Sequence, residues 1–120
     1  MNSVTKQLNI YKSSLNSIPT FKSVAIGLER GLGSKDAPFA RILPITHTPN
    51  GTSELLTFSV VFGFDSKNRD YEELHEKYFE AESEILNALK PYADWIETVT
   101  DEDSVPNLKT AVITFKGEMC

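Results

Sequence analysis

The sequence predicts an α+β fold in which two helices pack on one face of a mostly antiparallel sheet. Apolar residues recur every three or four positions over 3–17 and 71–89, as on the buried side of a helix. Apolar and polar residues alternate over 54–64, as in a strand with one covered face. Asn50-Gly51, just before that strand, is typical of a tight hairpin turn. We therefore expect the order α-β-β-β-α-β-β with a long central hairpin.

The first half of the chain supplies one helix and the first strands of the sheet. A helix over 3–17 is indicated by one apolar stripe, and Pro19 ends the pattern. The β-branched run 21–28 predicts a short strand. The next strand begins at Pro38, and Pro44 inside it predicts an edge strand or a bend.

The second half begins with the clearest strand, 54–64. One predicted face is fully apolar and consists of Leu56, Phe58, Val60, Phe62 and Phe64. The other is semi-polar and consists of Leu55, Thr57, Ser59, Val61 and Gly63. The second helix has Asp70 as its N-cap, with Glu73 three residues on, and Pro91 marks its end. We expect a strand or an irregular segment over 93–100, an acidic turn over 101–107 and a closing strand over 108–119.

Length and composition limit the classes of protein that the chain can belong to. Its 120 residues predict one domain over 1–120. A net charge of −5 is unfavourable for a broad nucleic-acid-binding face. Cys120 is the single cysteine, so a disulfide within the chain and a cysteine metal site are both excluded. The sequence contains no apolar run of transmembrane or signal-peptide type, and we expect no membrane association.

The stretch GLERGLGSKD, residues 27–36, resembles a phosphate-binding loop in its glycine content. Such a loop needs a helix N-terminus after it, whereas the residues from Pro38 predict a strand. The spacings GxxxxGK[ST] and GxGxxG are both absent. We interpret the stretch as a flexible connection in which four residues are candidates for contact with a partner: Arg30, Gly31, Gly33 and Lys35.

No residue pattern predicts catalysis. His47 and His75 belong to different elements and lack a nucleophile at a suitable spacing. Four glutamates recur every four residues on the second helix and form one acidic ridge: Glu72, Glu76, Glu80 and Glu84. A solvated helix face is the simplest interpretation, and lining of a channel is the alternative. We predict no enzyme activity and no catalytic, cofactor-binding or metal-binding residues.

The long hairpin is the feature that most suggests a partner. Each arm of about ten residues extends roughly 30 Å, which two helices cover with difficulty. Exposed strand edges are templates for association. A fully covered strand without a partner is the competing interpretation.

In this order of elements the chain resembles the tail terminator, or tail completion, proteins of long-tailed bacteriophages, and in particular the lambda-type minor tail proteins of that group. The resemblance rests on three stretches: APFARILPI, ELLTFSVVFGFDSKNRDYEELHEKYFEAESEILNAL and NLKTAVITFKGEM. It implies a homo-oligomeric ring, commonly a hexamer, that caps the growing tail tube and provides a surface for head joining. The ERGLGSKD loop is longer and richer in glycine than that resemblance leads us to expect.

The resemblance also implies roles for particular residues and partners. The hairpin arms are the candidate subunit interface, with Phe39, Arg41, Leu43, Ile45, Leu55, Thr57, Ser59 and Val61. The acidic ridge is a candidate lumen lining that repels DNA in transit. Further expected partners are the tail tube protein and head-completion or connector proteins. We expect the protein in the virion tail, and in the host cytoplasm during assembly.

Two other hypotheses stay open at this point. One is a small non-enzymatic adaptor or binding domain of a phage-derived or secretion apparatus. The other is a small enzyme that uses the glycine-rich stretch.

Overall fold

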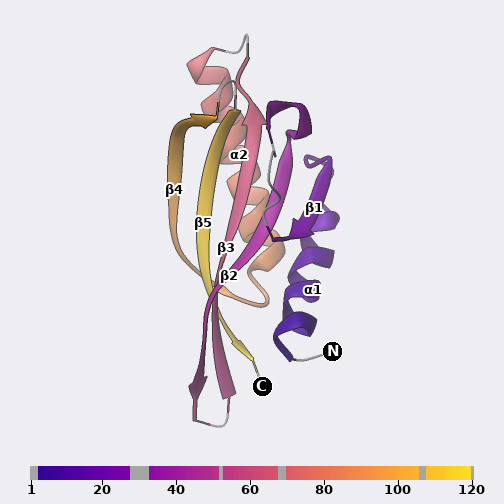
Figure 1. Cartoon of the computed structure of the whole chain (residues 1–120), viewed down its shortest axis with the longest axis vertical. Coiled ribbons are helices and arrows are strands. Elements are labelled where there is room, and N and C mark those ends of the chain that lie inside the picture. The colour runs from indigo at the N-terminus through magenta and orange to yellow at the C-terminus, as the bar shows by residue number, and fades with distance from the viewer. Residues whose placement is uncertain (1–2, 28–32, 52, 68–69, 106–107, 120) are drawn as a thin grey trace.

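The computed structural model describes residues 3–27, 33–51, 53–67, 70–105 and 108–119. They form α1 (Ser3–Asn16), β1 (Ser23–Ile26), a 3-10 turn η1 (Ser34–Asp36), β2 (Phe39–Asn50), β3 (Ser53–Asp65), α2 (Tyr71–Leu89), β4 (Asp94–Val105) and β5 (Leu108–Met119). The predicted α+β class and the order α-β-β-β-α-β-β are confirmed (Figure 1).

The five strands form one mixed sheet in the order β1-β2-β3-β5-β4. Three of the four pairings are antiparallel, namely β2–β3, β3–β5 and β5–β4. The fourth pairing, between β1 and β2, is parallel. The parallel pair is possible because residues 27–38 are long enough to return the chain to the other end of the sheet. The predicted mostly antiparallel sheet is therefore confirmed, with β1 as its exception.

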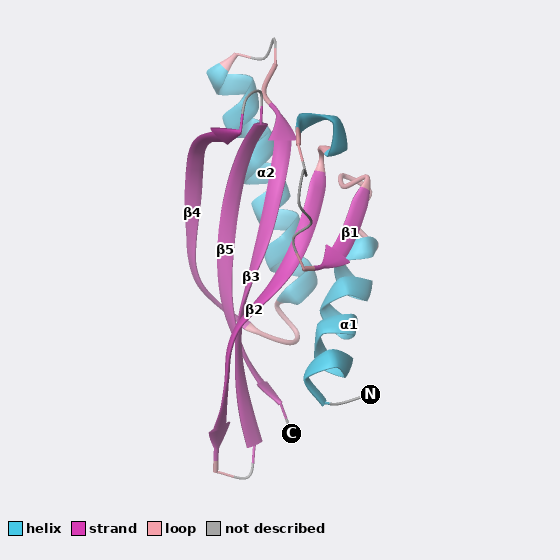
Figure 2. Ribbon diagram, viewed as in Figure 1, coloured by secondary structure: helices cyan, strands magenta, loops and turns pink. Residues whose placement is uncertain are grey.

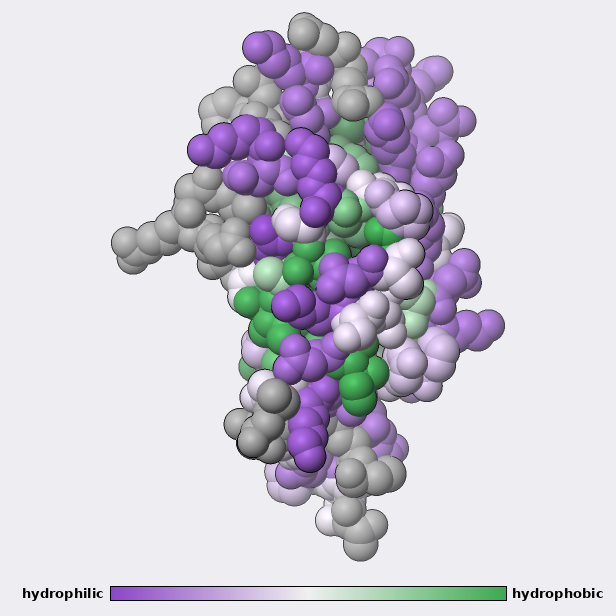
Figure 3. Space-filling model, turned by 90° about the vertical axis from the view of Figure 1, so that its right-hand side faces the viewer, coloured by the Kyte–Doolittle hydropathy of each residue, from purple (hydrophilic) through white to green (hydrophobic). Residues whose placement is uncertain are grey.

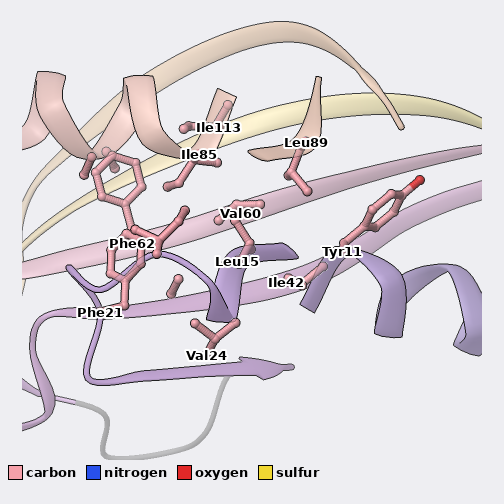
Figure 4. Packing of buried hydrophobic residues seen from close by; sticks show 14 of the residues in the cluster. Tyr11, Leu15, Phe21, Val24, Ile42, Val60, Phe62, Ile85, Leu89 and Ile113 are labelled. Atoms are coloured by element: carbon pink, nitrogen blue, oxygen red, sulfur yellow. The ribbon is translucent and has the colours of Figure 1, made fainter. Parts of the chain in front are cut away.

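Both helices cover the same face of this sheet (Figure 2). Tyr11 and Leu15 of α1, and Ile85 and Leu89 of α2, are fully buried against the strands. The sheet contributes alternate side chains to this core, among them Val60 at its centre (Figure 4). The predicted apolar face of β3 is confirmed, since all five of its members are buried: Leu56, Phe58, Val60, Phe62 and Phe64.

The hairpin of β2 and β3 is the longest feature of the molecule. Asn50 pairs with Ser53, and Gly51 adopts a positive φ of 65°, which glycine tolerates without a steric penalty. The two strands and the end of β5 project beyond the body (Figure 1), and the whole molecule measures 51 by 26 by 24 Å along its principal axes. The register of β2 shifts between Pro44 and Thr46, so the predicted bend at Pro44 is confirmed.

The second helix begins as predicted. The side chain of Asp70 accepts a hydrogen bond from the backbone N–H of Glu73 at 2.8 Å, which satisfies one unpaired donor of the first turn. Leu74, Tyr78 and Ala81 follow on the buried side of α2.

Two predicted boundaries are wrong. The first strand is shorter than 21–28, because it pairs with β2 from Ser23 to Ile26. The acidic turn predicted over 101–107 is mostly strand, because β4 continues to Val105 and pairs again with Leu108. A bulge between Asp101 and Val105 takes up the residues that do not pair, and pairing to β5 outweighs the weak strand preference of the acidic side chains.

Candidate functional site

The candidate interface residues lie largely on the face of the sheet opposite the helices, called here the helix-free face. Phe39 pairs with Gly63, Arg41 with Val61 and Leu43 with Ser59, all one position away from residues of the helix-covered core. Because side chains alternate along a strand, seven of the predicted residues share this face: Phe39, Arg41, Leu43, Leu55, Thr57, Ser59 and Val61. For Leu55, Thr57, Ser59 and Val61 this is the semi-polar face predicted from the alternation over 54–64.

Some of these residues have little surface left for a partner. Phe39 is buried in a second, smaller apolar cluster with Ala37 and Leu108. The absence of a side chain at Gly63 makes room for it, since an added Cβ there would lie 2.8 Å from the Phe39 ring. Ser59 is also buried and lies 3.3 Å from the hydroxyl of Thr114.

Arg41 is a buried cation on the helix-free face. Its guanidinium donates to the backbone oxygens of Ser23 and Ala40 at 3.1 and 2.9 Å, and to the Ser23 hydroxyl at 3.1 Å. It also lies 5.5 Å from the centre of the Phe39 ring, within reach of a cation–π attraction. Arg41 therefore fastens β1 to β2, a structural role that its position in the sequence does not indicate.

The other five members of the predicted interface keep accessible surface. Leu43, Leu55, Thr57 and Val61 are half-buried. Ile45 is 54% exposed and lies at the bulge of β2.

The glycine-rich stretch is placed in part. Arg30 and Gly31 lie outside the described residues. The backbone N–H of Gly33 donates to the Asp36 carboxylate at 2.9 Å, and Lys35 is exposed. The 3-10 turn that follows contacts β3, and the next residue, Ala37, packs on Phe39. The described end of this connection is thus held against the sheet.

The acidic ridge lies on the outer side of α2, as the sequence predicted. Glu72, Glu76 and Glu80 are exposed. Glu84 differs because it is half-buried, and its two carboxylate oxygens accept from the Thr20 hydroxyl at 2.9 and 3.0 Å. Phe79 lies within this acidic surface and is 62% exposed.

An open cavity of about 540 Å³ lies beside this ridge. Lys22 and Lys77 line it together with Asp65, Glu80 and Glu84, so its charges are of both signs. Thr20, whose hydroxyl donates to Glu84, also lines it, and the described residues give it no group of ligands for a metal ion. On the hairpin, Nε2 of His47 lies 3.4 Å from Oε1 of Glu54. On α2, the ring of His75 lies against that of Phe79, so the two histidines do not converge on one site.

The apolar side chains that remain exposed concentrate at the two edges of the sheet. Eight large hydrophobic residues are exposed among those described; four of them belong to the edge strands β1 and β4, and a fifth, Ile45, lies on β2 beyond its pairing with β1. Ile26 and Ile45 lie on the β1–β2 edge, and Trp95, Ile96 and Val99 lie on the β4 edge. Figure 3 shows hydrophobic side chains gathered in the middle of the side where α1 and β1 lie. Apolar side chains exposed on unpaired strands are typical of an association surface.

The β4 edge was not among the predicted sites. The segment 93–100 shows no clear alternation, because a bulge between Trp95 and Glu97 inserts Ile96 and changes the side to which the following residues point. The available signal was composition, since Trp95, Ile96 and Val99 are three strand-favouring residues in a short segment with no buried helix pattern.

Over the described residues, the fold is that of a small α+β protein with both α-helices on one face of the sheet and with β1 and β4 as its edge strands. No protein-family model matches the chain, and comparison with curated proteins gives no match. None of the described helices is long and apolar enough to cross a membrane.

Proposed function

We propose that the protein is a virion structural protein that caps the growing tail tube of a long-tailed phage or prophage as a homo-oligomeric ring. In this role it ends tail elongation and provides the surface to which the head joins. The observation that carries the proposal is the exposure of large apolar side chains along two opposite edges of one sheet. A chain with two different association edges binds its own copies head to tail, and such contacts produce rings when the rotation closes.

The projecting hairpin supports a contact with a second protein. All five residues from Ile45 to Pro49 are exposed, and they follow the last residue of β2 that pairs with β1. An arm that extends from each subunit suits attachment to the end of a repeating tube. We assign the tail tube protein to this arm and head-completion or connector proteins to the opposite end of the ring.

The ridge on α2 supports the proposed passage of DNA through the ring. Glu72, Glu76 and Glu80 are exposed, and carboxylates facing a lumen repel the phosphates of passing DNA. The expected site of action is accordingly the virion tail, after assembly in the host cytoplasm, with no membrane partner and with transient contact to DNA.

Electron microscopy of tails made without the protein tests this proposal. We expect tails of irregular, excessive length that are not joined to heads, and we expect the wild-type gene to restore normal tails. Normal-length tails joined to heads would reject the proposal. A purified chain that is functional as a monomer would instead favour an adaptor domain.

A further inference from the structure

The pairing of the strands determines which residues of the two sheet edges lie at the same level. Pro44 pairs with Phe58, Phe58 with Phe115 and Phe115 with Trp95, so one row runs from the β2 edge to the β4 edge. A second row runs from Ile26 through Ile42, Val60 and Ile113 to Thr98. The exposed apolar residues of the two edges therefore lie in the same or neighbouring rows.

A bulge occurs at this level on each edge. Ile45 is inserted between Pro44 and Thr46, and Ile96 is inserted between Trp95 and Glu97. Their side chains are 54% and 51% exposed. Both bulges adjoin the row of Pro44 and Trp95, so each edge carries a protruding isoleucine within one residue of that row.

The strand directions at the two edges are also compatible. β1 is parallel to β2, and β2, β3, β5 and β4 alternate in direction across the sheet, so β4 runs antiparallel to β1. When a second copy lies beside the first in the same orientation, its β4 therefore runs antiparallel to the first copy's β1. Antiparallel neighbours form the more stable type of ladder.

We propose that the occupant of the β4 edge is a second copy of this chain, which presents its β1 edge and the adjoining part of β2 around Ile45. The exposed apolar residues of the two edges lie in the same or neighbouring rows of the sheet. The contact therefore forms without a shift of one copy along the strands of the other. Repetition by rotation about an axis along the strands then closes into a flat ring, whereas a displacement would produce a helical filament. The inference deepens the proposed ring but does not depend on its place in a phage tail.

The two faces of the sheet are weaker candidates for this contact. The helix-covered face is occupied by α1 and α2. On the helix-free face Phe39, Arg41 and Ser59 are buried by the chain's own residues. The exposed large hydrophobic residues of the described strands lie on β1, β2 and β4, which form the two edges, and not on β3 or β5.

Two charge insertions, one at each edge, test the contact. We would measure molar mass by light scattering for the full-length wild type and for Ile96→Lys and Ile45→Lys, with Phe79→Lys as the matched control. Phe79 is 62% exposed but lies on α2, away from both edge strands. We expect the wild type and Phe79→Lys to form the same oligomer and each edge variant to be monomeric. Val99→Lys provides a second variant on the β4 edge, and a cooperative thermal unfolding transition in each variant verifies folding.

A mixture of the two edge variants determines whether the contact joins different edges. Ile96→Lys retains an intact β1–β2 edge, and Ile45→Lys retains an intact β4 edge. We therefore expect their mixture to form a one-to-one dimer that does not grow further. Persistent dimers of Ile45→Lys alone would show a symmetric β4–β4 contact and overturn the inference. A monomeric wild type at millimolar concentration, open filaments, or equal dissociation of Phe79→Lys would also overturn it.

These outcomes are independent of the phage experiment. One-to-one dimers together with normal tails in the deletion strain would retain the edge contact and reject the tail-cap function. A monomeric wild type together with over-long tails in the deletion strain would reject the edge contact and retain the tail-cap function.

Discussion

The helix-covered face of the sheet and its two edges use apolar residues in opposite ways. On the covered face Phe58, Val60 and Ile113 are completely buried beneath α1 and α2. On the edges Ile45, Trp95 and Ile96 are each about half exposed. Burial of apolar area stabilises a fold, whereas exposed apolar area that is concentrated at unpaired strands favours association. The covered face is therefore expected to determine stability, and the edges to determine assembly.

The largest expected effect comes from truncation of an aromatic ring on the covered face. Phe58 is fully buried, and its ring centre lies 4.3 Å from that of Tyr11 and 5.3 Å from that of Phe115. We expect Phe58→Ala to lower the free energy of unfolding by about 3–5 kcal/mol, through lost burial and an unfilled cavity. Urea denaturation measures the change.

The matched edge variant sharpens the comparison. Val99→Ala removes apolar atoms from a half-exposed position, and we expect it to change the free energy of unfolding of the monomer by less than about 0.5 kcal/mol. Equal losses in the two variants would mean that the edges contribute to folding as much as the covered face does.

A glycine of β5 gives the next largest effect. An added Cβ at Gly117 would lie 2.5 Å from the Tyr11 hydroxyl oxygen, and Tyr11 is fully buried. We expect Gly117→Ala to lower the free energy of unfolding by about 1–3 kcal/mol through overpacking. The addition of Tyr11→Phe should recover most of that loss, because it removes the clashing oxygen. Urea denaturation of the wild type, the two single variants and the double variant measures the four free energies of unfolding. A double variant no more stable than Gly117→Ala would show that the Tyr11 hydroxyl is not the source of the loss.

The smallest effect is a pH dependence that originates in the same tyrosine. Burial raises the pKa of the Tyr11 phenol, an effect that the Gln7 side chain partly offsets. The folded state therefore holds the phenol proton more tightly than the unfolded state, whose pKa is about 10. This contribution to stability is complete below pH 10 and is lost as the pH rises through the folded-state pKa. As the pH rises from below 10 to above 10, the urea midpoint of unfolding should fall more for the wild type than for Tyr11→Phe. An equal fall in the two chains would contradict a contribution of the Tyr11 phenol.

Much of the fold was predictable because its signals are local. The alternation over 54–64, the stripe over 3–17 and the cap at Asp70 each depend on residues close in the sequence. The parallel direction of β1 and the strand character of Asp101–Val105 were not predictable in this way. Both depend on pairing with distant partners, Phe39–Ile42 and the start of β5 respectively.

The candidate site was predictable to a smaller extent. Alternation placed Leu55, Thr57, Ser59 and Val61 on one face of β3, and the four-residue spacing placed the four glutamates on one side of α2, as observed. It gave no indication that Phe39 and Arg41 are buried, because Ala37 and Ser23, which contact them, precede the strand in the sequence. The exposed apolar residues of the two edges lie in the same or neighbouring rows because three strand pairings, β2–β3, β3–β5 and β5–β4, connect the edges. This correspondence is visible only in the folded chain.

Disulfide cross-linking between copies tests the central claim most directly. Ile26 and Thr98 belong to one row at opposite edges of the sheet, so in the proposed contact Ile26 of one copy faces Thr98 of the next. With Cys120→Ser as background, mild oxidation of the Ile26→Cys/Thr98→Cys chain should produce a ladder of covalent oligomers that ends at one closed species. Each single-cysteine chain should stop at a dimer or remain monomeric. A double-cysteine chain that stays monomeric after oxidation, under conditions in which the wild type is oligomeric, would contradict the edge-to-edge contact.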